Sequence, residues 1–321
     1  MSLTEKFRKF ARDCVDALRS HKKVLRSAIE RDDWETAGKI LQENKGAKDW
    51  VYKTPWAHEK PIHIAARNGS VQILTILLHP DFACPVDERN SSTETPLNLA
   101  MLCGHEIAAK LLLAKGADIH ASGRHGYSPL LCAISSGSVP LVELALSKGA
   151  VLNETQPGKG SPLMKAAYDP ASIHILKFLL DKGADPNCRG GGIEALTQCL
   201  HQPNPAGFRM LLDRGAKIDL SDTEGCVTLL NWAVMADHPD IVRTLLERGM
   251  DPLLPNAGGK TCVDIAQECS PAALKVIQTH IARLETEALN RLIEAEVREL
   301  HAGLAQQISV KTLRLLKPAM S

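Results

Sequence analysis

One short segment recurs along this chain and constrains the fold more than any other feature. It reads TPLNLAMLCGHEIAAKLLLAKGAD from Thr95 to Asp118. Thr95 suits a helix N-cap, Pro96 suits the first helical position, and Gly104 ends the helix because glycine readily adopts a positive φ. A second helix follows, with an apolar stripe made by Ile107, Ala108, Leu111 and Leu112. Two short helices cannot bury both of their apolar faces alone, so the unit requires copies of itself on either side.

The copies follow at a nearly constant spacing. The residue at the Pro96 position recurs in steps of 35, 33, 33, 33, 34 and 33, as Pro61, Pro96, Pro129, Pro162, Ala195, Leu229 and Cys262. The glycine that ends the second helix recurs as Gly116, Gly149, Gly183, Gly215 and Gly249. The segments that share the pattern are PIHIAA (61–66), TPLNLA (95–100), SPLLCA (128–133), SPLMKA (161–166), EALTQC (194–199), TLLNWA (228–233) and TCVDIA (261–266).

A period of 33 residues with a T-P-L-H-x-A-like signature resembles the ankyrin repeat. The resemblance covers residues 55–270, which is two thirds of the chain. It implies an all-α solenoid of helix-turn-helix repeats with hairpin-like finger loops. We therefore expect four parts: an N-terminal amphipathic helix (1–22), a degenerate capping repeat (23–54), the ankyrin repeat array (55–270) and a C-terminal helical extension (271–321).

Composition argues against several classes of protein. The formal net charge of +1 provides no overall field for nucleic acid or a membrane surface. The chain has no apolar run long enough to span a membrane, and its first residues lack the apolar core of a secretory signal. The nine cysteines stand singly, which favours reduced thiols and a cytoplasmic location; delivery into a host cell is also compatible with this pattern. We expect no metal and no cofactor, since no ligand spacing or phosphate-binding motif is present.

The two ends depart from the repeat pattern. Residues 2–20 read as an amphipathic helix, which we interpret as a cover for the open end of the solenoid; a membrane-surface helix is the alternative. After Pro271 the Pro-free segment 272–307 predicts one long helix of roughly 30 residues, or ~45 Å. A separate short basic helix is expected in the tail that begins at Ser309. Only the first part of the long helix can lie on the array, so the rest must fold back, bind a partner or pair with a second copy in a homo-oligomer.

No catalytic constellation is visible in the sequence. The chain lacks G-x-S-x-G, H-E-x-x-H, P-loop and kinase-type motifs, and neither flank is long enough for an independent catalytic domain. His63 stands at the histidine of the T-P-L-H signature. In ankyrin repeats that side chain stabilises a turn by hydrogen bonding, so the resemblance implies a structural role.

The resemblance also implies where a partner binds: on the finger tips and the exposed side of each first helix, which line a concave groove. Counting from each repeat start places there Trp56, Arg67, Leu102, Arg124, Tyr127, Tyr168, His201 and Met235, our candidate partner-binding residues. Aromatic and arginine side chains dominate interface energies. The acidic residues Glu59, Glu94, Asp169 and Glu224 are expected on the same surface and disfavour nucleic acid. Trp232, in contrast, occupies a first-helix position that we expect to be buried.

The leading hypothesis is therefore a non-enzymatic module or scaffold that binds another protein through the concave face and finger loops of its repeats. A second hypothesis is an inhibitor or host-directed effector that uses the same face to block or recruit an enzyme. A third, an enzyme with its site in the C-terminal helices, has the least support in the sequence.

Overall fold

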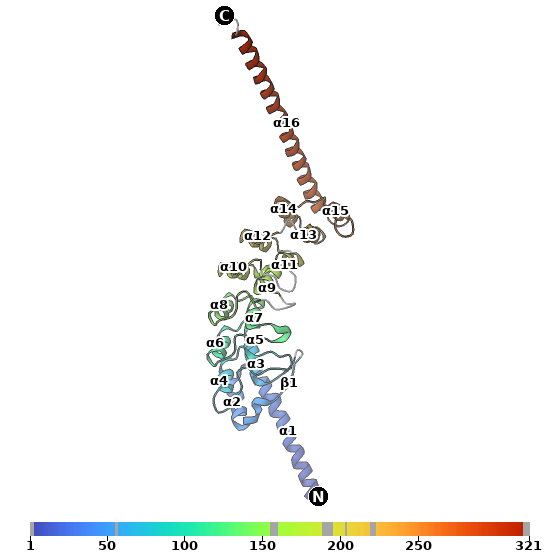
Figure 1. Ribbon diagram of the computed structural model, residues 1–321. Helices are drawn as coiled ribbons and strands as arrows, with labels where there is room; N and C mark the ends of the chain where they lie inside the picture. The colour runs from blue at the N-terminus through green and yellow to red at the C-terminus, as the bar shows by residue number, and fades with distance from the viewer. Residues whose placement is uncertain are drawn as a thin grey trace. The chain divides into compact units, whose positions relative to one another are not determined.

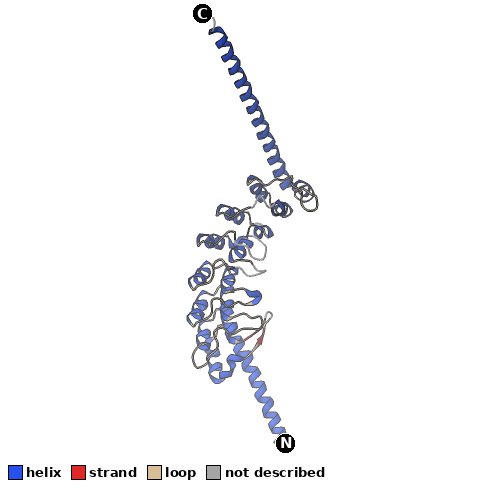
Figure 2. Cartoon of the chain, viewed as in Figure 1, coloured by secondary structure: helices blue, strands red, loops and turns tan. Residues whose placement is uncertain are grey.

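The computed structural model describes residues 3–54, 57–154, 160–187, 195–202, 204–218 and 223–316, with side chains for all of these except 3–16, 223–228 and 303–316 (Figure 1). Helices make up most of this part of the chain, and one small hairpin is present (Figure 2). The chain divides into two compact units, Met1–Lys217 and Ile218–Ser321.

The first unit consists of two layers of short helices (Figure 1). One layer holds α1 (Leu3–Glu30), α3 (Pro61–Asn68), α5 (Pro96–Leu102), α7 (Pro129–Ser135), α9 (Pro162–Tyr168) and α11 (Ala195–His201). The other layer holds α2 (Trp34–Glu43), α4 (Val71–Leu77), α6 (Glu106–Ala114), α8 (Val139–Ser147), α10 (Ile173–Asp181) and α12 (Pro205–Asp213). Each helix contacts the next helix of its own layer, so the repeats stack in chain order.

The connections of the first unit contain short 3-10 turns and the hairpin. The 3-10 turns are η1 (Lys45–Asp49), η2 (Arg124–Gly126) and η3 (Pro170–Ser172). Strands β1 (Tyr52–Lys53) and β2 (His58–Glu59) pair antiparallel, with Tyr52 opposite Glu59.

The described residues of the second unit form α13 (Thr223–Met235), α14 (Pro239–Glu247), α15 (Cys262–Cys269) and α16 (Pro271–Leu316). Helix α13 packs against α14 and α15, and the first turns of α16 pack against α14 and α15. The remainder of α16 continues as a single helix away from the other three (Figure 1).

The repeat spacing correctly predicts where the first helices begin. Five of the seven aligned residues, Pro61, Pro96, Pro129, Pro162 and Cys262, are the first residue of a helix; Ala195 is the first described residue of α11, and Leu229 lies inside α13, which is already helical at Thr223. The Thr95 hydroxyl accepts a hydrogen bond from the Asn98 N–H (3.2 Å), and Asn98 Oδ1 accepts one from the Thr95 N–H (3.0 Å). Gly104 ends α5 with a φ of 82°. The helices therefore begin and end at the expected signals.

The core lies between the two layers, where Leu97, Met101 and Leu112 are fully buried. Each such side chain stabilises the fold by roughly 1.5–3 kcal/mol. The predicted stripe of α6 is wrong by about one position: Ala108, Ala109 and Leu112 are buried, but Ile107 is 70% exposed. The buried residues keep the predicted spacing of i, i+1 and i+4. The helix was therefore correctly predicted, but its buried face lies one residue further along than expected.

Three other expectations about the helices need correction. The helix predicted over 2–20 and the first helix of the degenerate repeat form one continuous helix, α1, so the expected boundary at 22/23 falls inside it. Helix α16 has 46 residues, ~69 Å at 1.5 Å per residue, and includes the tail segment predicted as a separate helix. Neither junction contains a glycine or proline that would stop a helix. Glu224, expected at a finger tip, lies within α13.

His63 has the structural role that the signature implies. Its Nδ1 accepts a hydrogen bond from the Lys60 N–H (3.2 Å), and its Nε2 lies 2.9 Å from the carbonyl oxygen of Glu88. The side chain is fully buried. It therefore joins the start of α3 to the loop that leads to the next repeat.

Candidate functional site

The last residues of the first helices form an exposed row in the first unit. Leu102, Ser135, Tyr168 and His201 end α5, α7, α9 and α11, and all four are exposed. Leu102 keeps 40% and Tyr168 39% of its surface accessible. Because these four helices pack side by side, the row crosses four consecutive repeats (Figure 1). Three of the predicted binding residues are thereby brought to one surface.

Aromatic contacts connect neighbouring positions of this row. The rings of Tyr168 and His201 lie with centroids 6.2 Å apart and an interplanar angle of 42°. Tilted aromatic pairs of this separation attract one another through their quadrupoles. The contact links α9 to α11 and restrains both side chains before any partner arrives.

The finger loop before α7 joins the same surface through Lys165. The ammonium nitrogen of Lys165, on α9, lies 5.4 Å from the centroid of the Tyr127 ring, within the range of a cation–π interaction. Lys165 precedes Tyr168 by three residues, so both project from the same face of α9. We call the line of Tyr127, Lys165, Tyr168 and His201 the aromatic strip. It connects one finger loop to the ends of two helices.

The loop that carries Tyr127 is held by a buried amide. Asn98 Nδ2 donates hydrogen bonds to the carbonyl oxygens of Ala121 (3.2 Å) and Tyr127 (3.4 Å). A Cβ at Gly123 would come within 2.9 Å of Asn98 Oδ1, so only glycine fits there without displacement. Arg124 lies in the short turn η2 of this loop, three residues before Tyr127, and its side chain is exposed. The strip is thus built on a loop that the core fixes in place.

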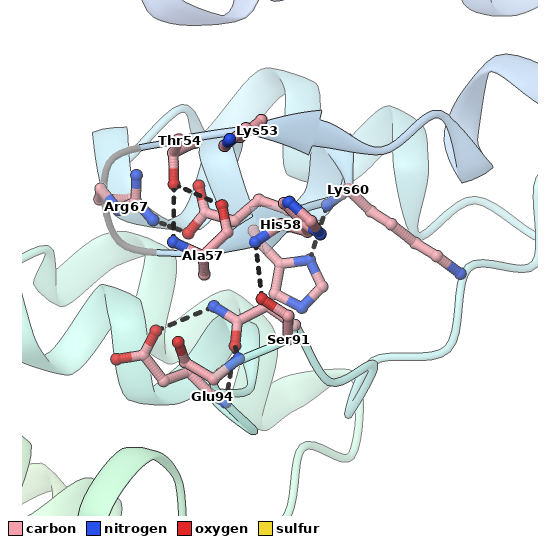
Figure 3. A network of polar contacts seen from close by, with 12 residues as sticks. Lys53, Thr54, Ala57, His58, Lys60, Arg67, Ser91 and Glu94 are labelled. Carbon is pink, nitrogen blue, oxygen red and sulfur yellow. Dashed lines mark hydrogen bonds and ion pairs between the residues drawn. The ribbon is translucent and has the colours of Figure 1, made fainter.

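Arg67 was predicted to be a charged anchor, but its guanidinium forms an ion pair within the protein. Its Nη2 contacts Oε1 of Glu59, whose side chain is fully buried (Figure 3). Burial lowers the pKa of Arg67. The expectation that Glu59 is exposed on the binding surface is wrong, because the hairpin turns this carboxylate inward toward α3. A partner would have to compete with Glu59 for Arg67.

The first two finger loops are joined by further polar contacts in the same region (Figure 3). The Thr54 hydroxyl donates to the Ala57 carbonyl oxygen (2.8 Å) across the hairpin. The His58 N–H donates to the Ser91 hydroxyl (2.7 Å), which belongs to the next loop. Lys60 forms ion pairs with Asp49 (3.3 Å) and Glu88 (3.1 Å). These contacts stabilise the loops against each other and mark this end as structural.

The second unit presents its own exposed pair, Trp232 and Met235. Met235 is 65% exposed, as expected, but Trp232 is 44% exposed rather than buried. Leu230, Ala233 and Val234 face the core of the unit instead. The aligned position is buried in the early repeats, as Leu99, but only half-buried in a later one, as Lys165. It lies at the edge of the packed face, so alignment alone could not assign its burial.

Trp56, the remaining predicted binding residue, lies outside the described residues. Two residues that the prediction missed are Lys165 and Trp232. A usable signal existed for Lys165, because a charged residue stands where two preceding repeats have Leu99 and Cys132. Among the described residues, no group of three or more His, Cys, Asp or Glu side chains is arranged to hold a metal ion. No described helix has the length and apolarity needed to cross a membrane.

Comparison with known proteins identifies the repeats. The family model for ankyrin repeats (3 copies) matches residues 25–123, 120–190 and 163–256. The chain belongs to the ankyrin repeat family. This family generally serves as a protein-protein interaction module without enzymatic activity.

The relatives are ankyrin-repeat proteins, and the match covers only part of each. The chain is 29% identical over 178 residues to the Caenorhabditis elegans "Ankyrin repeat and KH domain-containing protein mask-1", which covers 55% of this chain and 7% of that protein. It is 35% identical over 127 residues to the Mus musculus "B-cell lymphoma 3 protein homolog", covering 39% of this chain and 28% of that protein. The chain thus spans less than a third of these relatives. The crystal structure of the human ASB11 ankyrin repeat domain matches with a TM-score of 0.59 and 23% identity, covering 69% of this chain and 98% of that one.

Proposed function

We propose that this chain is a non-enzymatic scaffold that binds a partner protein through the face made by its finger loops and first-helix ends. The aromatic strip is the observation that carries the proposal. Tyr127 and Tyr168 are exposed or half-buried, yet each is held by a neighbouring side chain. A rigid, pre-positioned aromatic surface loses little conformational entropy when it binds.

Two of the remaining candidates extend this surface within the first unit. Leu102 lies one repeat before the strip, and Arg124 lies on the same finger loop as Tyr127. Met235, with Trp232, provides an exposed apolar pair on the second unit. Arg67 contributes least, because its charge is already paired with Glu59. We place the protein in the cytoplasm or, as an effector, inside a host cell, where its dispersed cysteines stay reduced.

A capture experiment tests the strip. The full chain, immobilised, is incubated with extract of its native cell, beside the variant Tyr127→Ala/Tyr168→Ala. The matched control is Ile107→Ala, which removes an even more exposed apolar side chain from a second helix. We expect the strip variant to lose its specific partner by at least about tenfold in affinity, and the control to retain it. Equal capture by all three proteins, with unchanged helical circular dichroism, would place binding elsewhere.

The inhibitor or effector hypothesis uses the same surface and is distinguished by the partner. If the captured protein is an enzyme, its turnover is measured with increasing amounts of the chain. Inhibition that disappears with the strip variant favours the inhibitor; unchanged turnover favours a scaffold. We further propose that α16 provides a second contact, through which two copies of the chain associate.

A further inference from the structure

A groove opens between α14 and α16 in the second unit. Its volume is about 490 Å³, within the usual size range of protein ligand sites. The apolar side chains Leu246 and Val276 contribute to its lining, together with the cations Arg243, Lys275 and Arg283. Glu247 is the one acidic side chain that lines it. The groove therefore suits an occupant that is both apolar and acidic.

The outer part of the same helix has no packing partner within the described residues. All residues from 282 to 302 are exposed. Leu289, Ile293, Val297 and Leu300 are between 43% and 66% exposed, and their steps of 4, 4 and 3 residues place them on one face. We call these four residues the α16 stripe. Exposed apolar rows of this kind mark interaction surfaces.

The opposite side of the outer helix is built for solvent. Arg291 Nη2 lies 4.0 Å from Glu287 Oε2, and Arg298 Nη2 lies 3.6 Å from Glu294 Oε2. Such pairs at i and i+4 stabilise an exposed helix by a few tenths of a kcal/mol. One face of the outer helix is charged and carries these intrahelical ion pairs. The apolar face packs against no other element among the described residues.

The groove and the α16 stripe overlap on one side of α16: Lys275 and Thr279 of the groove are in line with the stripe, whereas Val276 and His280 are in line with Glu294 and Arg298. Thr279 lines the groove, and Val297 follows it by 18 residues, which is about five helical turns. Lys275 and Ile293 have the same separation. The N-terminal part of this face, at the groove, is cationic and recessed. The later part, at the α16 stripe, is apolar and projecting. A surface whose two halves complement each other is the requirement for a two-fold symmetric pair.

Charge decides the orientation of the pair. Residues 284–302 contain five glutamates and two arginines, a net charge of −3 apart from His301. The groove contains three cations and one glutamate. Antiparallel helices bring the acidic outer half of one copy against the cationic groove of the other. Parallel helices in register would place acidic halves together.

We propose that two copies of this chain pair antiparallel, with the α16 stripe of each seated in the α14–α16 groove of the other. Glu296 and Glu299, which border the stripe, then face Arg243 and Lys275. This inference gives the seat of the self-association proposed above and uses none of the residues of the aromatic strip.

The test measures the oligomeric state of the full chain by sedimentation equilibrium. We expect a monomer–dimer equilibrium whose dissociation constant rises with salt. The groove variant Arg243→Glu/Lys275→Glu and the stripe-edge variant Glu296→Lys/Glu299→Lys should each weaken dimerisation by about tenfold or more, since each homodimer would contain two repelling contacts. Circular dichroism confirms that the helices persist, because all four side chains are exposed.

Mixing the two variants gives the decisive result. In a mixed dimer both contacts again join opposite charges, so dimerisation should recover. The control removes a charge from the face opposite the stripe, as Arg291→Gln, and should leave the dissociation constant unchanged. A protein that is monomeric at all concentrations would overturn the proposal. So would a dimer that Ile293→Ser/Val297→Ser abolishes but the groove variant does not affect, or a mixture that fails to recover. Partner capture through the aromatic strip is measured separately, so either proposal can fail without the other.

Discussion

Helix α9 and the outer part of α16 differ in how much of each helix is packed against its neighbours. Helix α9 has seven residues, and five of them are buried between α7 and α11. The outer part of α16, residues 282–302, is three times as long and has no buried residue. Isolated helices are marginal in water even at favourable length, because most helical stability comes from packing. The shorter helix is therefore expected to be the more stable one.

The difference also separates two kinds of exposed surface. Tyr168 is exposed at the end of a helix whose other faces are anchored, so its position is fixed without a partner. Leu289 and Leu300 are exposed on a helix that nothing in its own unit covers. The aromatic strip is thus a prepared surface, whereas the α16 stripe gains order when it is covered.

Hydrogen exchange should show the largest contrast. Amides of α7 and α9 should exchange only through global unfolding, which for an ordinary domain requires ~5–15 kcal/mol. Amides between residues 284 and 302 should exchange nearly as fast as in an unfolded chain when the protein is dilute. Mass-spectrometric exchange at two protein concentrations checks this, and the α16 amides should slow at the higher one. Strong protection of α16 in dilute protein would contradict the contrast.

The second-largest contrast should be the effect of a core leucine and of a surface leucine on the free energy of unfolding. Leu163, in α9, is 2% exposed, and Leu292, in α16, is 66% exposed. Leu163→Ala should lower the free energy of unfolding by roughly 2–5 kcal/mol through lost burial and a cavity. Leu292→Ala should change it by less than about 0.5 kcal/mol. Urea denaturation followed by circular dichroism measures both. Similar losses would mean that the outer part of α16 is packed in solution.

The sequence predicted the periodic part of this molecule well, because the signals there are local. A proline begins α3, α5, α7 and α9, and a glycine follows α6, α8, α10, α12 and α14, so Pro96 and Gly116 could be placed without knowing any neighbour. Exposure of Leu102 and Tyr168 followed from the same counting. These positions depend only on where a residue stands within its repeat.

The errors occurred where burial depends on tertiary packing rather than on the position of a residue within its repeat. Glu59 was expected in solvent, but the hairpin directs it toward Arg67 of α3. Trp232 was expected in the core, but its position lies at the edge of the packed face. The cation–π contact between Lys165 and Tyr127 joins residues 38 positions apart, and no local pattern encodes it. The length of α16 was underestimated because nothing in its tail stops a helix before Pro318.

Two helix caps, one buried and one near the surface, test the same contrast through smaller changes in stability. Thr95 is a fully buried cap whose partner Asn98 also holds the next finger loop. Thr261 caps α15 through the exposed Asp264. Thr95→Ala should lower the free energy of unfolding by about 2 kcal/mol and Thr261→Ala by about 0.5 kcal/mol, the two ends of the range for such caps. Urea denaturation of the two variants checks the order, and equal losses would show that burial of the cap is irrelevant.

The smallest effect we expect is a pH dependence carried by one imidazole of the packed repeats. Burial lowers the pKa of His63 below its ordinary value of 6.5; Glu88 opposes this, whereas the positive charge of Lys60 reinforces it. The neutral ring fits the site, since Nδ1 accepts the Lys60 N–H and Nε2–H can donate to the Glu88 carbonyl oxygen. Protonation of Nδ1 would break the first of these bonds.

The sign follows from proton linkage. Below pH 6.5 the unfolded chain binds a proton at His63 before the folded chain does, so the free energy of unfolding should fall as the pH falls through this region. Above pH 6.5 the contribution is complete. His63→Gln should be less stable at pH 7.5 and should lose part of the pH slope between 7.5 and 5. The control His125→Asn changes an exposed histidine and keeps a residue that tolerates its positive φ of 55°. If the slope survives in His63→Gln, another group carries it, and the hydrogen bonds of His63 do not depend on its neutral form.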